Sequence, residues 1–216
     1  MRSWIVWTTG LLAYIVAVLD RTTLGVSGLA AADRFSTGPG LLSTFVVLQV
    51  VVYAGAQIPA GVLLDRFGSR ALIASGGALM ASGQLALAFT ESLPTAIAAR
   101  AVVGLGDAMT FISVLRLVPH WFSMRQVPLV TQLTGICGQL GQVLSAVPFL
   151  AVLTAMGWTV AYASVASLGV LSIVLTLAIV KNTPDGTATT REPTSVRDTL
   201  SSVKTVWLRP GTRLGV

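Results

Sequence analysis

The sequence predicts an all-α membrane protein in which six helices cross the lipid bilayer as one bundle. Of the 216 residues, 54% are hydrophobic and only 10% are charged, whereas a soluble domain usually carries about 25% charged residues. So few charged residues could not cover the surface of a water-soluble core. In addition, the apolar residues form separate runs of about 20 residues, the length that crosses a hydrocarbon core of about 30 Å.

The apolar runs are bounded by charged residues, glycine or proline. They cover residues 4–31, 41–64, 71–90, 95–118, 128–152 and 158–180. The connections at residues 91–94 and 155–157 are so short that the helices on either side must be antiparallel neighbours. Residues 1–180 are therefore expected to form a bundle of helical hairpins.

The first run could imitate a secretory signal, because Arg2 precedes an apolar stretch and the small residues Ala30 to Ala32 follow it. Asp20 and Arg21, however, stand between that stretch and any cleavage site. Five further spans also follow it. A retained first helix is the better interpretation.

Lysine and arginine in the connections predict the orientation, because they resist translocation and stay in the cytoplasm. Eleven basic residues fall on one side of the predicted bundle and only Arg34 on the other. The eleven are Arg2, Arg66, Arg70, Arg116, Arg125 and six residues after position 180. We therefore expect a multi-pass protein of the inner (plasma) membrane with both termini in the cytoplasm.

Residues 181–216 are expected to form a cytoplasmic linker. Pro184, Asp185 and Gly186 open a polar, threonine-rich stretch, and residues 195–208 could form a short amphipathic helix at the membrane surface. Residues 210–216 resemble the approach to a seventh helix, so a truncation before that helix is expected.

An internal repeat of three plus three helices is also suggested. A shift of 87 positions aligns Asp20 with Asp107 and Thr44 with Thr131. Inverted repeats of this kind are common in transporters, although such matches also arise easily in a chain built from few residue types.

Several function classes lack the residues they need. The chain has a single histidine, His120, and a single cysteine, Cys137, and it contains none of the common nucleophile, zinc or phosphate-loop motifs. We expect no enzyme, no metal and no cofactor. The net charge of +6 comes from basic residues that occur singly between apolar runs, so no nucleic-acid partner is expected.

Four ionisable residues fall inside predicted spans, where charge is costly and usually faces the bundle interior. Asp20 and Arg21 lie in the first span, and Arg100 and Asp107 lie two turns apart in the fourth. Counting the helical rise places Asp20 and Arg100 at similar depths, which predicts an ion pair between them. Asp107 would lie deeper with no base one turn away, so it could take up and release protons. Arg21 offers a forked donor to an oxyanion. Alternatively, all four residues form purely structural ion pairs.

The connection from Gly61 to Arg70 reads Gly-Val-Leu-Leu-Asp-Arg-Phe-Gly-Ser-Arg. It resembles the Gly-x3-Asp-Arg-x-Gly-x-Arg loop of the major facilitator superfamily, departing from it at Ala71. The resemblance implies a half of that fold and a gating loop formed by Gly61, Asp65, Arg66, Gly68 and Arg70. Gly68 permits a tight turn, and Asp65 with Arg66 and Arg70 can form a charge latch.

A narrower resemblance reaches the anion:cation symporters of that superfamily. It rests on residues 19–24, residues 53–59, the Arg100-x6-Asp107 spacing and Trp121-Phe122-x-x-Arg125. It implies that Arg21 and Tyr53 bind the substrate anion, that Asp20 and Asp107 carry protons, and that Arg100 is their charge partner. Gln139, in a run with Gly135, Gly138 and Gly141, is a further candidate for substrate contact.

These observations predict a secondary transporter that carries a small organic anion with protons by alternating access. Its partners would be the lipid bilayer, the anionic substrate and a missing carboxy-terminal half of six helices. The alternatives are a drug or metabolite antiporter of the same superfamily, and a truncated six-helix remnant or partner subunit that does not transport.

Overall fold

The structure is a computed structural model that describes residues 1–184. Every regular element in this part of the chain is helical, which confirms the predicted all-α fold class. The elements are α1 (Arg2–Val26), α2 (Gly28–Arg34), α3 (Pro39–Phe89), α4 (Leu93–Trp121), α5 (Val127–Gly138), α6 (Leu140–Leu144), the π-helical turn η1 (Ser145–Phe149), α7 (Leu150–Met156) and α8 (Trp158–Ile179). The predicted linker from residue 185 onward, with its amphipathic helix at 195–208, lies outside the described residues.

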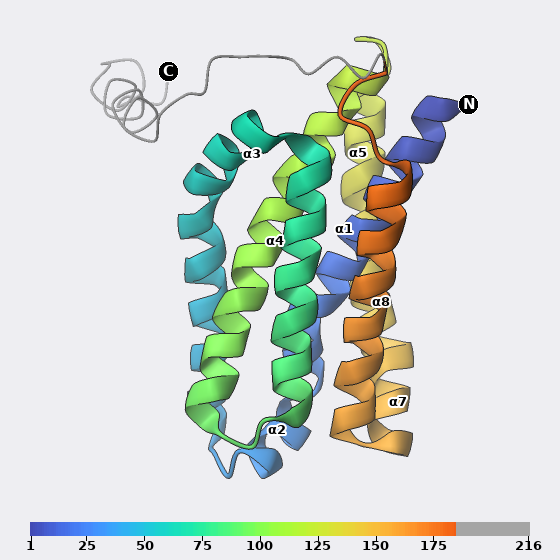
Figure 1. The fold of residues 1–216 in the computed structure, drawn as a ribbon. Coiled ribbons are helices and arrows are strands. Elements are labelled where there is room, and N and C mark those ends of the chain that lie inside the picture. Colours follow the sequence, from blue (N-terminus) through green and yellow to red (C-terminus); the bar gives the residue numbers. More distant parts are fainter. Residues whose placement is uncertain (185–216) are drawn as a thin grey trace, which may run out of the picture.

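Helix α3 passes through the bundle twice. It is 51 residues long and bends at Gly68, whose φ of 78° and ψ of 167° are not helical. A straight helix of that length would extend about 76 Å, more than twice a hydrocarbon core of about 30 Å. Figure 1 shows its second arm running back antiparallel to the first. Within residues 1–184, five helical stretches are long and apolar enough to span a membrane. Because α3 contributes two passes, this part of the chain makes six crossings.

Two of the predicted spans are interrupted. The first, expected at 4–31, is split at Ser27, whose hydroxyl hydrogen-bonds the Tyr162 hydroxyl at 2.7 Å. The fifth, expected at 128–152, contains η1 around Pro148. Proline has no N–H for the helical hydrogen bond, and a π turn is a common local adjustment to such a gap.

Helices α1 and α4 form the interior of the bundle. In their most apolar stretches 61% and 56% of the residues are buried, against 17 to 28% in the other spans. The second arm of α3 approaches α4 closely, because a methyl group on Gly76 would lie 2.7 Å from the Gly106 carbonyl oxygen. In lipid, the hydrophobic effect does not drive helices together, and small residues such as glycine allow the close packing that holds them. The outer helices present exposed apolar side chains that suit lipid, including Val47, Val51, Leu129, Leu171 and Val174.

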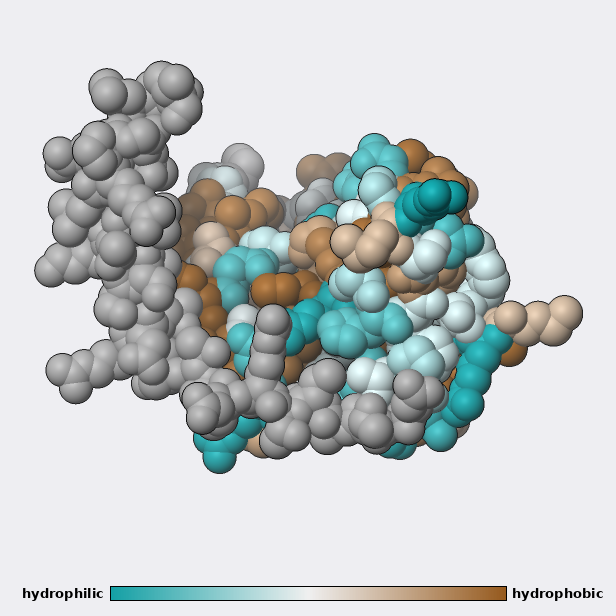
Figure 2. All heavy atoms as spheres, turned by 90° about the horizontal axis from the view of Figure 1, so that it is seen from above, coloured by the Kyte–Doolittle hydropathy of each residue, from teal (hydrophilic) through white to brown (hydrophobic). Residues whose placement is uncertain are grey.

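The connections fall at two opposite ends of the bundle. The start of α1, the α3 bend, the α4–α5 connection and the end of α8 lie at one end, which we call the bend end, and α2 lies at the other (Figure 1). Figure 2 looks onto the bend end and shows hydrophilic residues gathered across it. Four of the predicted cytoplasmic arginines, Arg2, Arg66, Arg70 and Arg125, belong to these bend-end segments. That this end faces the cytoplasm stays a prediction.

The bend gives a first test. Gly68→Ala is expected to lower the free energy of unfolding by about 1–3 kcal/mol through backbone strain. The substitution should lower the free energy of unfolding by about 1 kcal/mol more, because a methyl group at residue 68 would displace the Asn182 amide from its hydrogen bond with the Arg70 N–H. Gly157 is the matched control, since its φ is 84° and nothing lies within 4 Å of an added methyl group. Unfolding in mixed detergent micelles measures the free energy of unfolding of both variants, Gly68→Ala and Gly157→Ala. Equal losses for Gly68→Ala and Gly157→Ala would contradict the role given to Asn182.

Candidate functional site

An acid and a base from α1 face an acid and a base from α4 in the middle of the bundle. Asp20 and Arg100 are fully buried and Asp107 is 1% exposed. Arg21 differs, because 28% of its side chain is exposed. All four residues therefore turn inward, as the cost of charge in lipid requires, and the arginine of α1 is the one that reaches open space.

The charges pair differently from the sequence-based prediction. Arg21 Nη1 lies 3.5 Å from Asp107 Oδ2, so Asp107 does have a basic partner. The predicted ion pair between Asp20 and Arg100 does not form. Helical rise gives only depth, whereas the direction of a side chain depends on the rotation of the helix, since successive residues point about 100° apart.

Arg100 binds the backbone of α1 instead of a carboxylate. Its guanidinium donates to the carbonyl oxygens of Asp20 at 3.2 Å and Arg21 at 2.8 Å. It also donates to Gln49 Oε1 on the first arm of α3 and, at 3.5 Å, to Thr23 Oγ1. One buried cation thus joins α1, α3 and α4. Arg100 is the predicted charge partner of Asp20 and Asp107, and it reaches both carboxylates only through longer-range electrostatic interaction.

The carboxylate of Asp20 turns toward the second arm of α3. It accepts a hydrogen bond of 2.9 Å from Gln84 Nε2. The same nitrogen contacts the Asp20 carbonyl oxygen at 2.9 Å and Thr23 Oγ1 at 3.3 Å. Sequence reasoning missed Gln84 and Gln49, because a neutral amide within an apolar run carries no charge signal.

The predicted substrate residues Arg21 and Tyr53 do lie together. The Tyr53 hydroxyl interacts with the charges of Arg21 and Asp107 and with the Gln57 side chain. Tyr14 approaches the same two charged groups from α1 and was not predicted. It precedes Arg21 by seven residues, two helical turns, so the spacing would have placed it on the same face.

Arg21 opens onto a depression of about 540 Å³ between α1, the first arm of α3 and the α6–η1 segment. Its lining comprises Arg21, Thr22, Gly25, Val26, Val46, Gln142, Val143 and Ala146. Gln142, which had no predicted role, lies in this wall and donates to Gln139 Oε1 at 2.6 Å. The predicted contact residue Gln139 is exposed and reaches the depression through Gln142.

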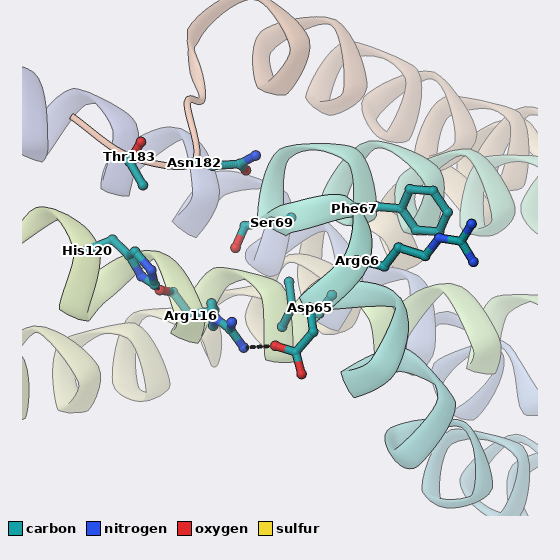
Figure 3. Close-up of a pocket in the computed structure, with 10 residues that line it drawn as sticks. Asp65, Arg66, Phe67, Ser69, Arg116, His120, Asn182 and Thr183 are labelled. Atoms are coloured by element: carbon teal, nitrogen blue, oxygen red, sulfur yellow. Dashed lines mark hydrogen bonds and ion pairs between the residues drawn. The ribbon is translucent and has the colours of Figure 1, made fainter. Parts of the chain in front are cut away.

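The predicted gating loop lies at the bend end, beside a small cavity of about 120 Å³ that Figure 3 shows in close-up. Asp65 pairs with Arg116 of α4 at 2.6 Å, and not with Arg66 or Arg70 as predicted. Arg66 points away from this pair, with its guanidinium 5.3 Å from the centre of the Phe67 ring. The partner on α4 could not be predicted, because it lies 51 residues away in the sequence.

Arg70 joins the bend to the end of α8. Its backbone N–H donates to Asn182 Oδ1 at 2.9 Å, and its guanidinium donates to the Leu177 carbonyl oxygen. Trp121 Nε1 adds a hydrogen bond of 3.0 Å to the Lys181 carbonyl oxygen. Gly61, one turn before Asp65, lies close to Ile112 of α4. The loop therefore ties three helices together at this end.

Comparisons of the sequence with known proteins identify its relatives. The family model described as Major Facilitator Superfamily matches residues 10–214. The chain is 31% identical to the methyl viologen resistance protein SmvA of Salmonella typhimurium over 108 residues, which are 50% of this chain and 22% of that protein. It is 22% identical to the probable L-galactonate transporter of Escherichia coli over 158 residues, 73% of this chain and 35% of the relative. It is 21% identical to the probable sulfoacetate transporter SauU of Cupriavidus necator over 174 residues, 81% and 40% of the two chains. The matched region thus spans less than half the length of each relative.

The Arg100 network gives a second test. Arg100→Met keeps an unbranched apolar side chain but removes the guanidinium and leaves buried acceptors without a donor, so the free energy of unfolding should fall by about 2–3 kcal/mol. Arg34→Met is the control at the opposite end, since it removes one partly buried hydrogen bond, to the Thr90 carbonyl oxygen, and a guanidinium that lies 5.5 Å from the centre of the Trp158 ring. Equal losses from both substitutions in a denaturant titration would refute the central role of Arg100.

Proposed function

The chain belongs to the Major Facilitator Superfamily, a family of membrane transporters, and on that premise we propose that it carries a small organic anion together with protons by alternating access. The observation that carries this proposal is Arg21, a partly exposed guanidinium in the middle of the membrane span beside the buried carboxylate of Asp107.

Arg21 favours an anionic substrate. A guanidinium stays charged in nearly every environment and binds carboxylate or sulfonate oxygens through parallel hydrogen bonds. Its contact with Asp107 is 3.5 Å long, whereas strong charge-assisted hydrogen bonds are about 2.7–2.9 Å. Donors therefore remain free for a ligand in the depression. The hydroxyls of Tyr14 and Tyr53 lie near enough to add polar contacts.

The same pair suggests how a proton would be coupled to the anion. If a substrate carboxylate takes over the guanidinium of Arg21, Asp107 loses its partner while it remains 1% exposed. An unpaired buried carboxylate is costly, so anion binding at Arg21 and proton binding at Asp107 would favour each other, as two linked ligands do. Asp20 is the second proposed proton carrier.

Alternating access requires a second wall for the substrate path. We propose that a further six-helix half faces the depression at Arg21, and that the carrier lies in the plasma membrane with its bend end in the cytoplasm. The names of the L-galactonate and sulfoacetate transporters point to anionic substrates for those two relatives, and these anions are the first probes to use.

A drug or metabolite antiporter is the second candidate. It is favoured by the similarity to SmvA, which is named for methyl viologen resistance, and by two buried carboxylates that could attract a cation. Methyl viologen is a dication, so Arg21 would repel it. The response of transport to substitutions at Arg21 therefore separates the two candidates.

In the native gene product reconstituted into vesicles, Arg21→Ala is expected to abolish uptake of labelled L-galactonate or sulfoacetate. Arg21→Lys should raise KM about ten- to a hundredfold, because it keeps the charge and loses about 1.5–3 kcal/mol of forked hydrogen bonding. Thr154→Val on α7, an exposed site outside the depression, is the control. Transport of methyl viologen that survives Arg21→Ala, without any anion uptake, would favour the antiporter.

Asp107→Asn is expected to separate transport from the proton gradient. Uptake by the unmodified carrier should rise as the external pH falls, because protons enter with the anion. The variant should lose this dependence and still exchange labelled for unlabelled substrate, a reaction that needs no net proton movement. Uptake by Asp107→Asn that keeps the original pH dependence would exclude Asp107 as the proton site.

A further inference from the structure

Asp20 has an unusual environment for a fully buried acid. In the part of the chain that the structure describes, no lysine or arginine nitrogen comes within 4.0 Å of its carboxylate. Its one hydrogen bond there is the 2.9 Å bond from Gln84 Nε2 to Oδ1, and Oδ2 has no partner. A neutral amide therefore stands where a cation would be expected.

Gln84 is held firmly in this place. It is fully buried, and the neighbouring Gly83 brings the second arm of α3 against α4, where an added methyl group would lie 2.8 Å from the Ala99 carbonyl oxygen. The nitrogen faces three oxygen acceptors, two of Asp20 and one of Thr23. The oxygen Oε1 is buried and has no hydrogen-bond partner. Packing thus fixes the position of the side chain, and a rotation about its last bond would exchange Nε2 for the unpartnered Oε1 without moving that position.

An amide can suit both forms of a carboxyl group. Its NH2 group donates to a carboxylate, and its oxygen accepts from a protonated carboxyl. A half turn about the last side-chain bond exchanges the two. An arginine could not do this, because it has no acceptor.

We propose that Gln84 is a positioning residue for Asp20: its amide holds the ionised carboxylate and turns by half a turn when the carboxyl group takes up a proton. The inference rests on the proposed proton coupling. It explains why the bundle interior places an amide and not a base at this carboxylate.

The charged and titratable groups around Asp20 are consistent with this role. Arg100 and Asp107 approach from α4, and Arg21 is the next residue on α1. Tyr162 approaches from α8, where its hydroxyl is bound to Ser27, and α3 adds Tyr53 nearer to Asp107. Arg100 directs its donors to the α1 carbonyl oxygens and to Gln49. The direct donor to the carboxylate is Gln84.

The test measures substrate uptake by the native gene product against external pH. Gln84→Met keeps the length of the side chain and removes the amide, so the pH of half-maximal uptake should rise by about one unit. KM at low pH should stay unchanged, because Asp20 is protonated there in either variant. Gln126→Met, at an exposed position before α5, is the matched control. An unchanged pH of half-maximal uptake in Gln84→Met would overturn the proposal.

Gln84→Glu guards against a variant that fails to fold, since it has the same shape. Two adjacent carboxyl groups share a proton, so this variant should also shift the profile upward, and an unshifted profile would refute the inference. Infrared spectra should show the C=O band of the protonated Asp20, identified by its loss in Asp20→Asn, at higher pH in both variants. If Asp20→Asn keeps the original pH profile, the coupling role of Asp20 fails. If Asp20→Asn changes the pH profile of uptake but Gln84→Met and Gln84→Glu do not, Asp20 keeps its proposed coupling role and the role given to Gln84 fails.

Discussion

The arrangement of the bundle depends on one constraint, that the guanidinium of Arg100 is buried where no water can solvate it. A buried cation must find acceptors, and here it finds them on the backbone of α1 and on Gln49 of α3. Binding the carbonyl oxygens at positions 20 and 21 fixes the rotation of α1 at that depth. Arg21 is then directed toward Asp107 and the depression, and Asp20 toward Gln84. Arg100 thus sets the position of Arg21, the residue proposed to bind the substrate.

Helix α4 connects the middle of the membrane to the bend end. In the interior, Arg100 contacts the backbone of Arg21 on α1 and Asp107 contacts its side chain. Near the end of α4, Arg116 contacts Asp65 on α3. Any tilt of α4 relative to α1 would change the 3.5 Å contact of Arg21 with Asp107. The same tilt relative to α3 would strain the pair of Arg116 with Asp65. Helix α4 therefore links the contact of Arg21 in the interior to the Asp65 pair at the bend end.

Much of this could be predicted from the sequence, and the reasons are physical. The spans are predictable because about 20 apolar residues are needed to cross a membrane. Asp20, Arg21, Arg100 and Asp107 are predictable because charge inside a span is costly. Their pairing is not, since depth along a helix does not give the direction of a side chain. The cost of charge in a span does not single out Gln84, Gln49 and Tyr14, because they carry no charge, and a proline alone does not predict the π turn at Pro148 because it does not specify how a helix adapts to it.

The bond between the Arg70 backbone N–H and Asn182 joins residues 112 positions apart. Membrane helices leave the ribosome in order from the amino terminus, so the first two passes through the bilayer exist long before Asn182 is synthesised. Until α8 has been inserted, the hairpin at Gly68 therefore lacks its distant partner and its helix ends remain open to other contacts. Completion of the sixth crossing is then the step that locks the turn between the second and third.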